Sequence, residues 1–103
     1  MLHIYPVSIQ LCRDANDICR RVPDASLRDQ LRRAVASVPL NMAESDGQRG
    51  GNRRQRRLTA LGSAREVGAC FDVIEALGYA VIDDAVRARL DHIIGALVKL
   101  TRR

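Results

Sequence analysis

Apolar residues that return every three or four positions, in four separate segments, constrain the fold of this chain more than any other feature. Residues at this spacing lie on one face of an α-helix. No segment has the strict alternation of apolar and polar residues that is typical of a half-buried strand. In the first segment, predicted as a helix over about residues 5–21, the apolar positions are Ile4, Val7, Leu11, Ala15, Ile18 and Val22.

The second segment continues to about residue 46, and its inward residues are Leu27, Leu31, Ala34, Val35, Val38 and Met42. We expect Ser26 to cap its start, with Asp29 three residues later as the second member of a capping box. Pro39 interrupts the apolar face, because it cannot donate a hydrogen bond to the carbonyl of Val35 and crowds it. Helical spacing continues on both sides, so Pro39 predicts a kink within one helix rather than its end.

The remaining sequence predicts two more helices after a glycine-rich loop formed by Gly47, Gly50, Gly51 and Asn52. The third helix is expected over residues 53–77, and Gly78 suits the left-handed position that follows a helix end. The fourth is expected to be capped by Asp83 or Asp84. The inward residues of these helices are Leu58, Leu61, Ala64, Val67, Phe71, Ile74 and Leu77, then Val86, Leu90, Ile93, Leu97 and Leu100.

Four helices joined by short links predict an all-α protein, an antiparallel up-down four-helix bundle. The 103 residues fit a single domain, residues 1–103, since one core typically holds about 100–150 residues. Aromatic residues make up only 3% of the chain, which is unlike the aromatic and β-branched composition of strands.

Charge and cysteine content indicate the class of partner and the compartment. The net charge of +5 predicts an anionic partner: a nucleic acid, an acidic protein or a membrane surface. No apolar run approaches the roughly 18 residues of a membrane span. Three cysteines without metal-binding spacing, and no signal segment before them, predict a cytoplasmic protein without a metal or cofactor. A zinc site would require His3 and His92 to converge from opposite ends of the sequence.

A cluster of arginines is the candidate binding site for a nucleic acid. In an up-down bundle the loop before the third helix lies at the same end as the C-terminus, so seven arginines share that end. The opposite end has Asp24, Asp83 and Asp84 beside Arg20 and Arg21, and is roughly balanced in charge. We define the basic end by Arg49, Arg53, Arg54, Arg56, Arg57, Arg102 and Arg103.

Two further patterns have both a structural and a functional interpretation. Ser37, Asn41 and Glu44 form a polar stripe, which is either a ligand site or a hydrogen-bonded network at Pro39; we favour the network, with partners among Arg32, Arg33 and Glu66. Three glycines inside helices each cost about 1 kcal/mol relative to Ala. Close approach of a neighbouring helix or a subunit interface would offset that cost at Gly62, Gly68 and Gly95.

Arg87 and His92 raise an enzymatic alternative. Their spacing occurs in metal-independent ribonucleases built on helical bundles. Sixteen arginines in the chain make such a pair a frequent coincidence, and His92 falls beside the apolar stripe of its helix. A protein without enzymatic activity is therefore the favoured prediction, with a purely structural oligomer as a third possibility.

Several short motifs resemble one known family. They are Gln30-Leu31-Arg32-Arg33-Ala34, Ser37-Val38-Pro39, Asn41-Met42-Ala43-Glu44, Gly47 with Arg49, Gly62-Ser63 with Glu66, and Leu77-Gly78-Tyr79. From about Leu27 onward the chain resembles the four-helix-bundle family of 23S ribosomal RNA intervening-sequence proteins, to which the accessory variability determinant of diversity-generating retroelements is similar. It departs from the usual pattern in lacking an early aromatic in the first helix and in having Ser45 after the Ala-Glu pair.

The resemblance implies a non-enzymatic bundle that assembles into a ring-like homopentamer with a basic surface for nucleic acid, RNA or DNA. It also implies a reverse transcriptase or another protein as a further partner.

Overall fold

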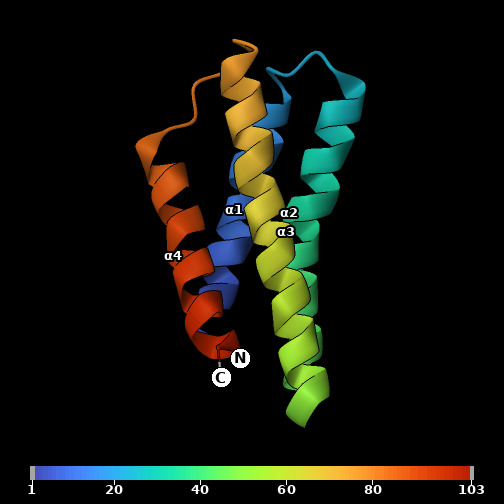
Figure 1. The fold of residues 1–103 in the computed structure, drawn as a ribbon. Helices are drawn as coiled ribbons and strands as arrows, with labels where there is room; N and C mark the ends of the chain where they lie inside the picture. The colour runs from blue at the N-terminus through green and yellow to red at the C-terminus, as the bar shows by residue number, and fades with distance from the viewer. Residues whose placement is uncertain (1, 103) are drawn as a thin grey trace.

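The computed structural model describes residues 2–102. It contains α1 (Ile4–Cys19), α2 (Ala25–Asp46), α3 (Gly50–Ala76) and α4 (Asp84–Thr101), shown in Figure 1. No strand occurs between residues 2 and 102. The structure confirms the prediction of an all-α protein built as a four-helix bundle.

Each helix packs against the next one in sequence, and α4 closes the bundle against α1. Figure 1 shows successive helices running in opposite directions, with the chain ends and the α2–α3 connection at the same end of the molecule. The start of α3 extends beyond the end of α4 at that end. The bundle measures 42 × 24 × 21 Å. None of the helices in the described region combines the length and the apolar character that crossing a membrane requires.

The core is one cluster of apolar side chains from all four helices, with Phe71 the largest that is fully buried. Most of the predicted inward residues are buried, but the prediction was wrong for Leu77 and Leu100, which are 55% and 37% exposed. Leu77 lies outside because α3 ends at Ala76. Thr101 is buried at the end of α4, where its hydroxyl donates to the carbonyl of Leu97 at 2.7 Å.

The predicted start of the second helix was also wrong. Asp24, not Ser26, is the N-cap of α2: its backbone is extended and its carboxylate accepts a hydrogen bond from the amide of Leu27 at 3.0 Å. Ser26 lies inside the first turn. An aspartate cap suits this position because a carboxylate complements the positive end of the helix dipole.

The glycine-rich loop is shorter than predicted. α3 already begins at Gly50, so only residues 47–49 connect it to α2. Gly50 has a φ of 58°, a backbone conformation that side chains with a Cβ rarely adopt. At the other end of α3, Gly78 has a φ of 73° and confirms the predicted left-handed position. The amides of Gly78 and Tyr79 bond to the carbonyls of Glu75 and Ile74, which closes the helix.

Helix α2 continues through Pro39, as predicted, while the kink itself stays a prediction. The carbonyl of Val35, which Pro39 leaves without its helical donor, accepts a hydrogen bond from the thiol of Cys12 on α1 at 3.5 Å. A side chain from a neighbouring helix thus replaces the missing backbone donor. Burial raises the pKa of the Cys12, Cys19 and Cys70 thiols, which favours the neutral, unreactive form.

The position of Phe71 leads to a test of the core. Phe71→Ala should lower the free energy of unfolding by about 3–5 kcal/mol, because it removes a fully buried ring and leaves a cavity. Urea unfolding followed by circular dichroism measures this loss. Val81→Ala is the control, since Val81 is 77% exposed and its truncation should change stability by less than about 0.5 kcal/mol. Equal effects of the two substitutions would contradict the assigned core.

Candidate nucleic-acid interface

One hydrogen bond joins the two parts of the basic end. The guanidinium of Arg54, in the second turn of α3, donates from Nε to the carbonyl of Thr101 at 2.8 Å. Thr101 is the last residue of α4, and Arg102 follows it directly. The arginines at the start of α3 therefore lie beside those at the end of the chain, although about 50 residues separate them in sequence.

The other arginines of the basic end have different surroundings. Arg53 donates from Nε to the carbonyl of Gln48 at 3.0 Å, and Arg56 forms a 2.9 Å ion pair with Glu44 of α2. Arg49 and Arg102 are exposed. Arg57 is half-buried, and its Nε is buried without a hydrogen-bond partner within the described chain. Arg103 lies outside the described residues.

The start of α3 adds to the positive potential of these side chains. Its first turn contains no acidic residue, and Arg49 occupies the N-cap without a side-chain cap. A helix N-terminus presents unpaired amides and the positive end of the helix dipole. Two carboxylates on the last turn of α2, those of Glu44 and Asp46, lie at the same end of the bundle. The arginines exceed them in number, so the end remains positive.

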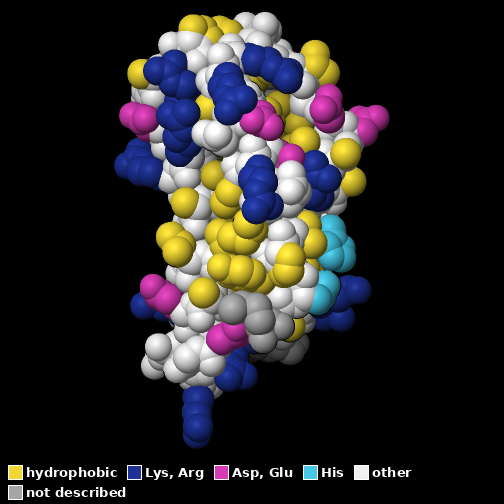
Figure 2. Space-filling model, turned by 180° about the vertical axis from the view of Figure 1, so that it is seen from behind, with side chains coloured by type: hydrophobic (Ala, Val, Ile, Leu, Met, Phe, Trp, Pro, Cys, Tyr) yellow, Lys and Arg dark blue, Asp and Glu magenta, His cyan; other side chains and the backbone are white. Residues whose placement is uncertain are grey.

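Charges are mixed over the rest of the bundle. Figure 2 shows Asp and Glu side chains among the arginines in the upper half of the rear face, and a hydrophobic band across its middle. Arg20 pairs with Asp17 at 3.4 Å, and Arg89 with Asp14 at 2.7 Å. The basic end differs from the rest of the bundle in the number of arginines that it gathers, not in a lack of carboxylates, since Arg56 pairs there with Glu44.

The polar stripe of α2 forms hydrogen bonds between α2 and α3. Ser37 and Ser63 are joined through their hydroxyls at 2.7 Å, and the Asn41 amide donates to the carbonyl and hydroxyl of Ser37 at 2.9 and 3.0 Å. Glu44 pairs with Arg56 instead of joining this group. Arg33 and Glu66 line the adjacent shallow hollow, whereas Arg32 is exposed on α2 and does not line it. Ser63 was missed as a partner because only the packing of α2 on α3 brings it near.

Arg87 and His92 contact different parts of the bundle. The Arg87 guanidinium lies 5.6 Å from the centre of the Phe71 ring and bonds to Asp72 and Glu75, all on α3. His92 lies instead against His3 at the start of α1. The neighbours of the Arg87 guanidinium thus lie on α3, and the neighbour of the His92 ring is His3.

The fold and the basic end together define a small helical-bundle protein with one strongly positive end. The model of the family described as 23S rRNA-intervening sequence protein matches residues 1–99. The chain therefore belongs to this family, and the match includes the first helix, ahead of the region where the motifs were recognised. No curated protein matches the sequence.

The Arg87 cluster leads to a prediction about pH. The amide of Ile82 and the guanidinium of Arg87 both donate to the Glu75 carboxylate and lower its pKa. Ionised Glu75 therefore stabilises the fold above the pKa of an unfolded glutamate, about 4.3, and this contribution is lost as pH falls through the lower folded-state value. The variant Glu75→Gln, whose side chain cannot ionise, should have a lower free energy of unfolding than wild type at neutral pH. The difference between the two free energies should become smaller in acid. Urea unfolding of both proteins at neutral pH and near pH 3 measures this difference. A difference of the same size at both pH values would contradict the stabilising role of ionised Glu75.

Proposed function

We propose that the protein is a non-enzymatic, homo-oligomeric nucleic-acid-binding protein that acts through its basic end. The observation that carries the proposal is the gathering of arginines around the projecting N-terminus of α3, next to the end of α4. Guanidinium groups bind phosphate oxygens in a bidentate manner, and the free amides of a helix start also favour anions. Both features suit a phosphate backbone.

The aromatic residues of the chain support recognition through phosphate rather than through bases. Phe71 is fully buried, and Tyr5 and Tyr79 are half-buried and pack against the core. Because the chain has no other Phe, Tyr or Trp, no such ring stands free to stack on a base. We therefore expect little preference for sequence.

The salt dependence of binding tests this proposal. Wild-type protein should bind RNA or DNA of any sequence at low salt, with a log–log slope of about −0.7 to −0.9 per phosphate neutralised. Replacing four arginines of the basic end together, Arg53, Arg54, Arg56 and Arg57, with Ala should weaken binding to all sequences and flatten the slope. Fluorescence anisotropy at several salt concentrations measures both effects.

A second quadruple variant serves as the matched control. It replaces four other arginines with Ala and therefore loses the same charge. These arginines are exposed and lie in the half of the bundle away from the basic end: Arg13, Arg20, Arg21 and Arg32. This variant should keep most of the affinity and most of the slope. Equal losses in both variants would indicate a general effect of net charge, and no binding by wild type at low salt would refute the proposal.

A glycine inside α3, Gly62, supports the homo-oligomer, which the family resemblance suggests is a pentamer. A Cβ added at Gly68 would meet a side-chain atom of Leu90 at 3.4 Å, so neighbouring packing accounts for that glycine. A Cβ at Gly62 or Gly95 would meet nothing within 4 Å, so close approach of a helix within the protomer does not explain them. A neighbouring subunit that packs on the surface around Gly62 would offset the cost of that glycine in helix propensity.

A ring of subunits would present the basic end repeatedly on one side. Several weak contacts to one long polyanion then combine into a much higher apparent affinity without any new type of contact. The unsatisfied Nε of Arg57 is consistent with an end that is incomplete in the isolated protomer.

Gly62→Leu tests the oligomer separately from the fold. The added side chain meets open space within the protomer, so helicity should be kept, whereas a subunit packed on this surface would be displaced. Multi-angle light scattering should report a multiple of 11.4 kDa for wild type and a smaller mass for the variant. The matched Gly68→Leu should instead destabilise the protomer through Leu90. A wild-type mass of 11.4 kDa at micromolar concentration would refute the oligomer.

A further inference from the structure

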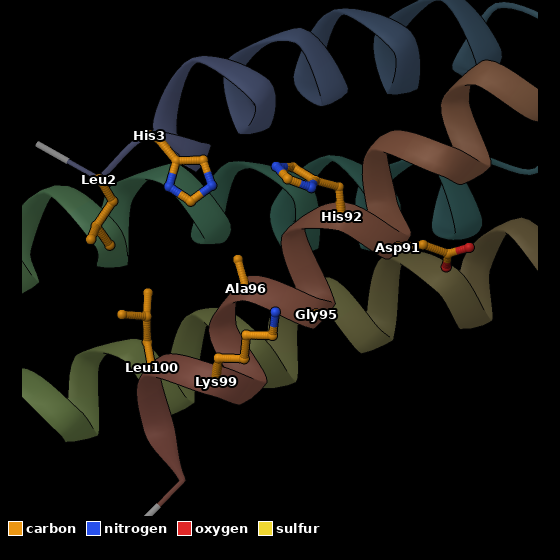
Figure 3. Close-up of a pocket in the computed structure, with 8 residues that line it drawn as sticks. All are labelled: Leu2, His3, Asp91, His92, Gly95, Ala96, Lys99 and Leu100. Atoms are coloured by element: carbon orange, nitrogen blue, oxygen red, sulfur yellow. The ribbon is translucent and has the colours of Figure 1, made fainter.

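The two histidines of the chain meet on the surface, although they are far apart in the sequence. His3 lies just before α1 and His92 on α4, and their ring centres are 5.5 Å apart at an interplanar angle of 68°. Figure 3 shows the two rings facing one another, with a nitrogen of each directed toward the other ring. Both residues are exposed.

From this geometry we propose that His3 and His92 form a binding site for a divalent transition-metal ion, for which Zn²⁺ is the probe. Imidazole is a preferred ligand of Zn²⁺, Cu²⁺ and Ni²⁺. A zinc ion about 2.0–2.1 Å from one nitrogen of each ring, at a tetrahedral angle, would set the ring centres roughly 5 Å apart. The observed separation is therefore close to that of a bound pair.

The surroundings leave space for the remaining ligands of the ion. The histidines line a hollow of about 370 Å³ together with Leu2, Asp91, Gly95, Ala96, Lys99 and Leu100. Gly95 lies almost one turn after His92, and a Cβ there would meet nothing within 4 Å, so this side of the hollow is open. No group of three or more His, Cys, Asp or Glu side chains suited to a metal occurs between residues 2 and 102. The ion would thus keep water molecules in its other positions.

The charges of the hollow give a cation no assistance, so the two imidazoles alone would hold the ion. Asp91 and Lys99 carry opposite charges at its wall, and Figure 3 shows the Asp91 carboxylate directed away from the two rings. Neither imidazole has a hydrogen-bond or ion-pair partner in the described part of the chain, so no other group occupies their ring nitrogens. Protons compete with the ion for the same nitrogens, and binding should therefore weaken in acid.

A bound ion would connect the start of α1 to the middle of α4. These helices are the first and last of the bundle and pack directly against each other. An ion that binds only the folded state raises the melting temperature as its concentration rises. The site should therefore stabilise the closure of the bundle, which provides a readout independent of nucleic-acid binding.

Zinc titration of the untagged, full-length protein tests the proposal. Calorimetry should detect one Zn²⁺ per chain, and both imidazoles should shift in histidine NMR spectra. His3→Gln and His92→Gln should each weaken binding at least about tenfold, the lower limit seen when even an outer-shell partner of a metal ligand is lost. At the same zinc concentration, the melting temperature of wild type should rise more than that of either variant.

Asp91→Asn is the matched control, because Asp91 lines the hollow without facing the rings, and it should retain both binding and the thermal shift. Circular dichroism checks that the histidine variants remain folded. Absence of binding at millimolar zinc would mean that the two rings form only an aromatic contact, and would overturn the proposal. Binding that survives in the variant lacking both histidines would assign the ion to other residues, such as the cysteines, and would overturn it equally.

Discussion

The pairing of α2 with α3 is the constraint on which the rest of the molecule depends. These are the two longest helices, with 22 and 27 residues, and hydroxyl groups on both meet in the Ser37–Ser63 hydrogen bond. The start of α3 extends beyond α4, where no fourth helix can cover an apolar surface. The chain places glycines and arginines there instead. Unequal helix lengths therefore account for the polar character of this end, since a projecting helix end is exposed to water, while its positive sign comes from the arginines themselves.

A buried proline in α2 shows how a local defect is compensated by tertiary structure. Pro39 removes a backbone donor within a buried segment, and an unpaired carbonyl there would cost about 1–3 kcal/mol. The Cys12 thiol supplies a weak donor from α1. Three other buried polar groups are satisfied within a single helix instead of between two. The hydroxyls of Ser8, Ser45 and Thr101 each donate to a backbone carbonyl of their own helix. Each of these side chains thus has a backbone carbonyl as its hydrogen-bond acceptor.

The sequence predicted the number and order of the helices well, because apolar periodicity reports directly on burial. The predictions were wrong at the ends of helices, where the exact terminal residue matters. Asp24 rather than Ser26 caps α2, and Leu77 is exposed because α3 ends at Ala76. Proximity within the basic end followed from topology alone, whereas the Arg54–Thr101 hydrogen bond required coordinates. The convergence of His3 and His92 was considered and set aside, since nothing in their spacing indicates that the first and last helices bring them together.

The packing of α1 against α4 is, within residues 2–102, the one helix pairing between elements that are not consecutive in sequence. The other three pairings need only short connections, so their loop-closure entropy is small and each hairpin can form early. Joining α1 to α4 closes a loop of nearly the whole chain. We therefore expect the consecutive helix pairs to form first and the packing of α1 against α4 to form last. We also expect local unfolding of the native state to begin with the separation of α1 from α4. The Arg89–Asp14 ion pair joins α1 to α4. It would slow the separation of these two helices, which we expect to be the first step of unfolding.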